Sequence, residues 1–139
     1  MIPRVSGFSI AELELREPDS GWGLFEIGQV NWSTESGRLD VVMSDNLGEL
    51  CLSFVEPISF RSQDEGDMID YWAVRQDEDI DVAPLYSIEK SAYLAGLSGN
   101  AVSSFNGKLS HWLVAGNNQC VEVITYAENC PTVVETERY

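Results

Sequence analysis

The stretch that predicts the fold most clearly is LDVVMSDNLGELCLSFV, residues 39–55. Apolar side chains recur at every second position on both sides of DNLG (45–48), which is the period of a strand with one buried face. Asp, Asn and Gly are favoured in tight turns because they tolerate positive φ. We therefore predict an antiparallel hairpin over residues 39–55.

A second stretch repeats this pattern. It consists of SHWLVA (110–115), the turn GNN (116–118) and CVEVITY (120–126), and it predicts another antiparallel hairpin. Four shorter segments also have the composition of strands: 8–15, 24–30, 58–61 and 132–135.

One segment, residues 84–99, predicts a helix. Pro84 and Ser87 suit its first turn, and Gly96 and Gly99 suit its end. A rough apolar stripe lies between them, formed by Ile88, Ala92 and Ala95.

Residues 68–74 fit either a helix or a strand, because acids precede them while polar and apolar residues also alternate. We therefore expect a single α+β domain over residues 1–139. It would contain a mostly antiparallel β-sheet and one or two α-helices.

The chain is strongly acidic, with 23 Asp and Glu against 8 Lys and Arg and a net charge of −15. Such a charge repels nucleic acid and anionic membranes and attracts cations or basic proteins. Eight carboxylates and the single base Arg75 lie between residues 62 and 81. With two aromatic residues that suit either a core or an interface, this region is the predicted partner-binding surface: Asp64, Glu65, Asp67, Asp70, Tyr71, Trp72, Asp77, Glu78, Asp79 and Asp81.

The apolar runs are too short to span a bilayer, and the N-terminus lacks the apolar segment of a secretory signal. The three cysteines, Cys51, Cys120 and Cys130, form an odd set without a Cys-x-x-Cys pair. We therefore expect a cytoplasmic protein with reduced thiols. Cys51 and Cys120, beside apolar residues, are predicted to be buried as small hydrophobic side chains.

Two motifs suggest serine catalysis. SIEK (87–90) matches S-x-x-K and SDN (44–46) matches S-D-N, as in the penicillin-binding serine enzymes. Their order is reversed here and K-T-G is absent, so a helix cap with a surface lysine is the preferred interpretation. We predict no catalytic residue.

Two sets of residues contain side chains of the types that bind metals. His111 is the only histidine, and it shows no close spacing with the cysteines that would indicate zinc. DEDID (77–81) resembles the start of an EF-hand loop, but Val82 and Ile88 occupy the positions that need Gly and Glu. We predict neither a metal nor another cofactor.

Three segments carry a family resemblance: ISFRSQDEGD (58–67), PLYSIEKSAYL (84–94), and HWLV (111–114) followed by CVEVI (120–124). Together they resemble small bacterial immunity proteins encoded beside polymorphic or contact-dependent toxins. The resemblance spans residues 58–126 and includes no catalytic motif. It implies a cytoplasmic α+β protein that neutralises one toxin domain, and it assigns no interface residues.

An acidic surface agrees with such a function, because a nuclease toxin would present a basic cleft. Two other classes remain open from the sequence. One is a small acidic enzyme with an unrecognised carboxylate pair. The other is an anionic nucleic-acid mimic that inhibits a DNA-binding protein.

Overall fold

The computed structural model describes residues 5–10, 25–45, 48–64, 68–80, 84–98 and 109–138. Within these ranges the chain forms two antiparallel sheets and two short helices. The strands are β1 (Val5–Ile10), β2 (Glu26–Ser33), β3 (Arg38–Asp45), β4 (Gly48–Val55), β5 (Ser59–Asp64), β6 (Leu85–Ser91), β7 (Leu109–Ala115), β8 (Gln119–Tyr126) and β9 (Thr132–Arg138), and the helices are α1 (Ile69–Asp77) and α2 (Ala92–Ser98). The predicted combination of antiparallel strands with two helices is confirmed, but the strands form two sheets instead of one.

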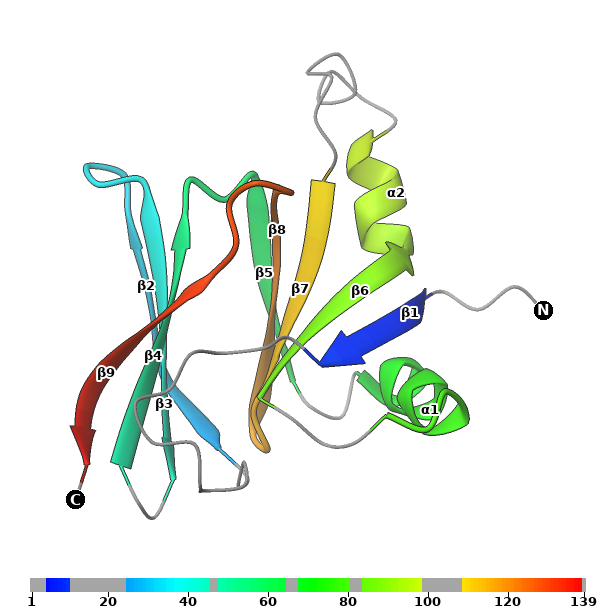
Figure 1. The fold of residues 1–139 in the computed structure, drawn as a ribbon, viewed down its shortest axis with the longest axis horizontal. Coiled ribbons are helices and arrows are strands. Elements are labelled where there is room, and N and C mark those ends of the chain that lie inside the picture. Colours follow the sequence, from blue (N-terminus) through cyan, green and yellow to red (C-terminus); the bar gives the residue numbers. More distant parts are fainter. Residues whose placement is uncertain are drawn as a thin grey trace.

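The elements form three layers (Figure 1). A four-stranded sheet, in the order β2-β3-β4-β9, faces a five-stranded sheet in the order β1-β6-β7-β8-β5. Both helices lie on the other side of the five-stranded sheet. That sheet is therefore the central layer and is covered on both faces.

Both predicted hairpins are confirmed. In the first, β3 pairs with β4 from Arg38 opposite Val55 to Asp45 opposite Gly48. In the second, β7 pairs with β8 from Leu109 opposite Tyr126 onward. Alternation along each strand turns one apolar row toward the interior, which fixes the register.

The main core fills the space between the two sheets. On the four-stranded sheet, Leu39, Val41 and Met43 alternate inward and are completely buried. They belong to one apolar cluster with Val121 and Val123 of the five-stranded sheet. This is the packing of a β-sandwich, in which two sheets bury their facing rows.

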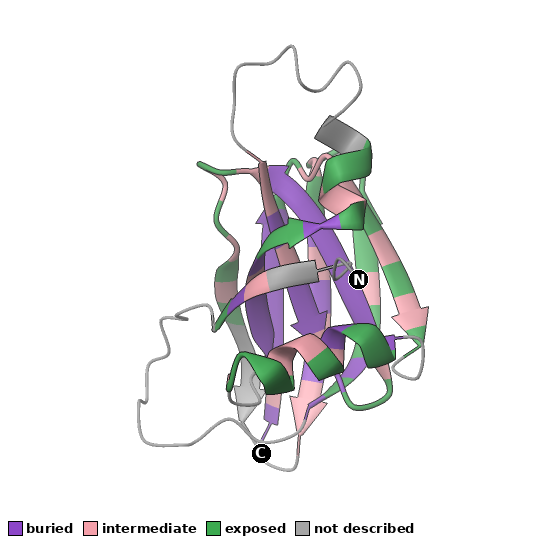
Figure 2. Ribbon diagram, turned by 90° about the vertical axis from the view of Figure 1, so that its right-hand side faces the viewer, coloured by how far each residue is buried: buried purple, intermediate pink, exposed green. Residues whose placement is uncertain are grey.

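A second core lies between the five-stranded sheet and the helices. Tyr71 of α1 and Met68, just before it, pack with Phe8, Tyr86 and other apolar residues of the sheet. Figure 2 shows α1 mostly in the colours of exposed and intermediate residues, and Tyr71 is its buried residue. Because both faces of the five-stranded sheet are covered, β8 has six consecutive buried residues, 120–125.

The predicted helix over residues 84–99 is wrong in its first half. Residues Leu85–Ser91 form β6, which pairs with β1 and β7, and α2 begins only at Ala92. Tyr86 and Ile88 pack in the core beneath α1, whereas Leu85 packs in the core between the sheets. Because this strand is apolar on both faces, its residues imitate the stripe of a helix.

The segment that fitted helix or strand, residues 68–74, is mostly helical, since α1 spans Ile69–Asp77. The four shorter strand predictions are confirmed with shifted bounds as β1, β2, β5 and β9, and residues 11–15 and 24 lie outside the described ranges. Neither described helix has the length and apolar character needed to cross a bilayer.

Candidate functional site

The predicted acidic surface centres on α1. Asp70 and Asp77 lie on the helix, Glu78 and Asp79 lie in the turn that follows it, and Asp64 ends β5. All five carboxylates are exposed. The other predicted acids, Glu65, Asp67 and Asp81, lie outside the described residues.

Two of these carboxylates share one side of the helix. Asp70 and Asp77 are seven residues apart, about two helical turns, so they project from α1 in nearly the same direction. Asp70 also stands in the first turn, where a negative charge favours the helix dipole. We call Asp70 and Asp77 the α1 acidic face.

The two aromatic residues predicted for this surface differ in position. Tyr71 is 5% exposed and makes an edge-to-face contact with Phe8, so its ring belongs to the core. Trp72 is half-buried, and the guanidinium of Arg75 stands 4.9 Å from its ring centroid. By the same helical spacing, Trp72 lies on roughly the opposite side of α1 from Asp70 and Asp77, so neither aromatic ring adds to the α1 acidic face.

The turn after α1 uses its acids for structure. The Glu78 carboxylate accepts hydrogen bonds from the backbone N–H groups of Gly7 (3.1 Å) and Phe8 (3.2 Å), which ties β1 to the end of the helix. Asp79 has φ of 57°, a left-handed conformation that ends the helix and that Asp tolerates better than most residues. Replacing Glu78 would therefore disturb the fold as well as the charge.

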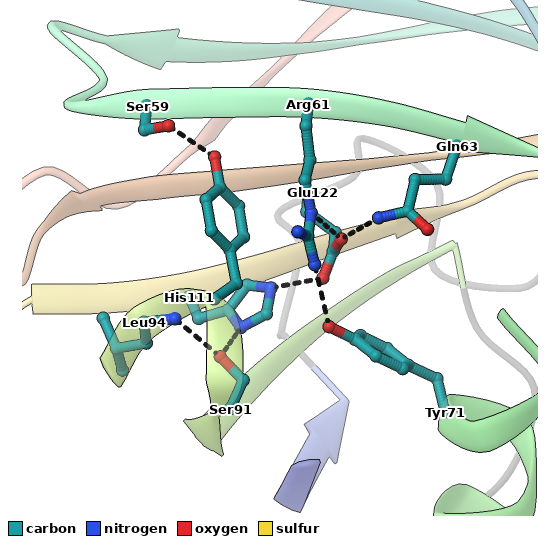
Figure 3. Close-up of polar contacts among 9 residues, drawn as sticks. Ser59, Arg61, Gln63, Tyr71, Ser91, Leu94, His111 and Glu122 are labelled. Atoms are coloured by element: carbon teal, nitrogen blue, oxygen red, sulfur yellow. Dashed lines mark hydrogen bonds and ion pairs between the residues drawn. The ribbon is translucent and has the colours of Figure 1, made fainter. Parts of the chain in front are cut away.

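A buried polar network lies on the helix-covered face of the five-stranded sheet (Figure 3). Its centre is Glu122, whose side chain is fully buried. Arg61 Nε donates to Glu122 Oε2 at 2.5 Å, and Gln63 Nε2 donates to the same oxygen at 3.2 Å. His111 Nε2 lies 2.9 Å from Glu122 Oε1.

The network continues from the histidine to helix α2. His111 Nδ1 lies 2.7 Å from Ser91 Oγ, and Ser91 Oγ accepts a hydrogen bond from Leu94 N–H at 3.0 Å. Ser91 is the residue before α2, so this last bond is the N-cap of the helix. The serine therefore links the helix terminus to the buried histidine.

Strand register explains how these residues meet. Arg61 of β5 and Glu122 of β8 are directly opposite each other, so their side chains leave the sheet on the same face. His111 lies on the neighbouring strand β7, opposite Ile124. The three polar side chains thus converge from three adjacent strands.

The buried carboxylate is held in its ionised form. Burial by itself raises the pKa of Glu122, but hydrogen bonds from His111, Arg61 and Tyr71 outweigh burial and bring the pKa to about 2. Burial and the nearby Glu122 raise the pKa of Tyr71, so its hydroxyl stays protonated. Arg61, one third exposed, also stacks over the Tyr93 ring at 4.0 Å and connects the network to the surface.

Ser91 contacts His111, and His111 contacts Glu122, which is the order of contacts in the Ser-His-acid triad of acyl-transfer enzymes. Their environment favours a structural role. Ser91 is 7% exposed and its oxygen is occupied as a helix cap, while His111 and Glu122 have no exposed surface. Glu122 also forms an ion pair with Arg61, so we infer that the network stabilises the fold.

The histidine and cysteines considered for a metal site do not come together in the described residues. Both ring nitrogens of His111 have partners, Ser91 and Glu122, so the ring has no free nitrogen to offer a metal. The described part of the chain contains no group of three His, Cys, Asp or Glu side chains that could hold a metal ion. Cys51 and Cys120 are buried, as predicted, and form no disulfide, and burial raises the pKa of Cys51.

The network around Glu122 was not predicted from the sequence, although one signal in the sequence points to it. Glu122 is the only charged residue in the apolar strand CVEVITY, and a lone charge in such a strand requires a buried partner.

Comparison of the chain with protein-family models, with curated proteins and with solved structures gives no match. Its function is therefore inferred from its own side chains.

Proposed function

We propose that this chain is a non-enzymatic, cytoplasmic binding protein that neutralises a basic partner, as an immunity protein for a cognate bacterial toxin domain. The observation that carries the proposal is the set of exposed carboxylates on and around α1: Asp64, Asp70, Asp77, Glu78 and Asp79. The basic residue of this helix, Arg75, is partly buried and lies against Trp72. The helix therefore presents mainly negative charge to solvent.

Electrostatic steering explains why such a surface suits an immunity protein. A net charge of −15 attracts a basic protein over long range, and steered association reaches about 10⁸–10⁹ M⁻¹s⁻¹ at low salt. Fast capture protects a cell because the toxin is bound before it acts. A nuclease domain, whose basic cleft holds phosphates, is the toxin class that best complements this charge.

The rigid scaffold beneath the α1 acidic face supports the same role. Tyr71 and Met68 anchor the helix in the second core, and Glu78 ties its end to β1. A preformed surface loses little conformational entropy when a partner docks. The buried Ser91–His111–Glu122 contacts hold the neighbouring sheet in place instead of offering a reactive group.

Co-expression with the toxin domain encoded by the adjacent gene tests the proposal. We expect the wild type to restore growth and the double variant Asp70→Asn/Asp77→Asn to protect poorly. The matched control is Glu26→Gln/Glu128→Gln, which removes the same charge from two exposed positions outside α1 and its turn. Equal protection by all three proteins would place the interface elsewhere, and failure of the wild type to protect would refute the immunity function.

A further inference from the structure

One end of the β-sandwich combines exposed aromatic and acidic side chains. Within the described ranges five large apolar side chains are exposed, and three of them lie at this end: Trp32 near the end of β2, Val55 at the end of β4 and Phe60 near the start of β5. The β2–β3 turn and the β4–β5 link meet here (Figure 1), with Glu56 N–H donating to Gly37 C=O at 2.6 Å. We call Trp32, Glu35, Val55, Glu56 and Phe60 the aromatic end.

The two aromatic rings come from different sheets. Trp32 lies on the edge strand β2 of the four-stranded sheet, and Phe60 lies on the edge strand β5 of the five-stranded sheet. Their ring centroids are 5.8 Å apart. Trp32 stays 43% exposed and Phe60 37%, so each ring keeps surface available for a partner.

Both rings also point toward the space between the sheets. Trp32 is paired with Leu39, and Phe60 with Val123, and both of these residues are buried in the main core. Directly opposite residues of a sheet lie on the same face, so the aromatic pair extends that core to its open edge. The rings are therefore held by the two sheets and not by a loose loop.

The surroundings of the aromatic pair are acidic. Glu35 and Glu56 are exposed, and Asp40 pairs with the exposed Arg38 at 3.2 Å. Three carboxylates against one guanidinium give this end a local charge of −2. Together with the net charge of −15, this disfavours a second copy of the chain as occupant and favours a basic partner.

The backbone of Glu56 gives an independent indication that the aromatic end is a binding site. Its φ is 48°, in the left-handed region where glycine is the unstrained residue. A glutamate kept in this conformation places its side chain beside Gly37 at the expense of backbone strain. Strained non-glycine residues of this kind concentrate at binding sites.

An aromatic face flanked by carboxylates has the chemistry that recognises a guanidinium. The planar cation stacks on the ring, and its N–H groups donate to the acids. The same arrangement occurs within this protein, where Arg61 lies 4.0 Å from the Tyr93 ring centroid and bonds Glu122. We infer that the aromatic end is a docking surface for arginine side chains of a basic protein partner, an inference that rests on the proposed function and supplies a contact separate from α1.

The test uses an acetylated, amidated hexa-arginine peptide, with hexa-lysine as the comparison, titrated into the full chain and followed by ¹H–¹⁵N spectra. We expect the Trp32 indole N–H and the Phe60 amide to shift with hexa-arginine, and hexa-lysine to bind about two- to five-fold more weakly, since stacking favours the guanidinium.

Substitutions make the test specific. We expect Trp32→Leu, which keeps an apolar side chain at the edge of the core, to weaken hexa-arginine binding about two- to five-fold. Glu56→Gln should weaken it as well, with the Trp32 indole as reporter. Glu26→Gln, the same charge change at the opposite end of strand β2, should have a smaller effect.

The outcomes separate this inference from the proposed function. Shifts confined to α1, or unchanged affinity in both Trp32→Leu and Glu56→Gln, would overturn the docking surface and leave the proposed function standing. Arginine-selective shifts at Trp32 and Phe60, in a chain that fails to protect against the adjacent toxin, would support the docking surface and refute the immunity function.

Discussion

Replacing Glu122 with Gln should lower the free energy of unfolding by about 3 kcal/mol at pH 7. The pKa of this carboxyl is about 2 in the folded chain, against 4.5 for the ordinary group. The difference, multiplied by about 1.4 kcal/mol for each pH unit, gives roughly 3 kcal/mol of stability from the ionised form. The side chain is fully buried, so solvent does not screen this contribution.

The same pKa values fix the pH dependence. A lowered pKa stabilises the fold above pH 4.5, and the stabilisation is lost as the pH falls toward 2. At pH 3 the ionised carboxylate contributes only about 1 kcal/mol, so the difference between wild type and Glu122→Gln should shrink accordingly. Urea unfolding at pH 7 and pH 3 measures both values.

Glu128→Gln is the control, because Glu128 is exposed and its replacement should change the free energy of unfolding by less than about 0.5 kcal/mol. A Glu122→Gln variant within 1 kcal/mol of the wild type at pH 7 would refute the role of this network. A difference that stays constant down to pH 3 would refute the lowered pKa.

Ser91→Ala should destabilise the chain by about 1–2 kcal/mol in urea unfolding, because the α2 cap and the partner of His111 Nδ1 are lost together; no change would contradict the linking role of Ser91. Asp79→Gly should raise stability by about 0.5 kcal/mol by relieving the left-handed backbone, and a loss of stability would show that the Asp side chain is needed. Reductant and stoichiometric Zn²⁺ should leave the melting temperature unchanged, since the described cysteines form no disulfide and His111 has two partners. Tight zinc binding in calorimetry would revive an enzymatic function.

The two hairpins were predictable because their signals are local. In residues 39–55 the alternation and the turn residues lie within one short stretch, and the structure pairs Leu39 with Phe54 as that pattern requires. Alternation identifies the buried face of a strand but not the element that covers it. It could not show that Leu39 packs against Val121 of a second sheet.

β6 shows where local pattern fails. Its spacing of apolar residues suits a helix, and only its pairing with β1 and β7 makes it a strand. The polar network also depends on strand pairing. Arg61 and Glu122 are 61 residues apart in the sequence and meet only through the register of β5 and β8. Contacts of this range follow from sheet topology, which no single segment encodes.

The rate of association with the adjacent toxin domain, measured against salt, tests the central claim most directly. We predict that Asp70→Asn/Asp77→Asn slows association by about three-fold or more at low salt, while Glu26→Gln/Glu128→Gln changes it less. The deficit should vanish near 1 M salt, where the Debye length is about 3 Å. Equal rates for both variants and the wild type at low salt would contradict the claim that the α1 acidic face captures a basic partner.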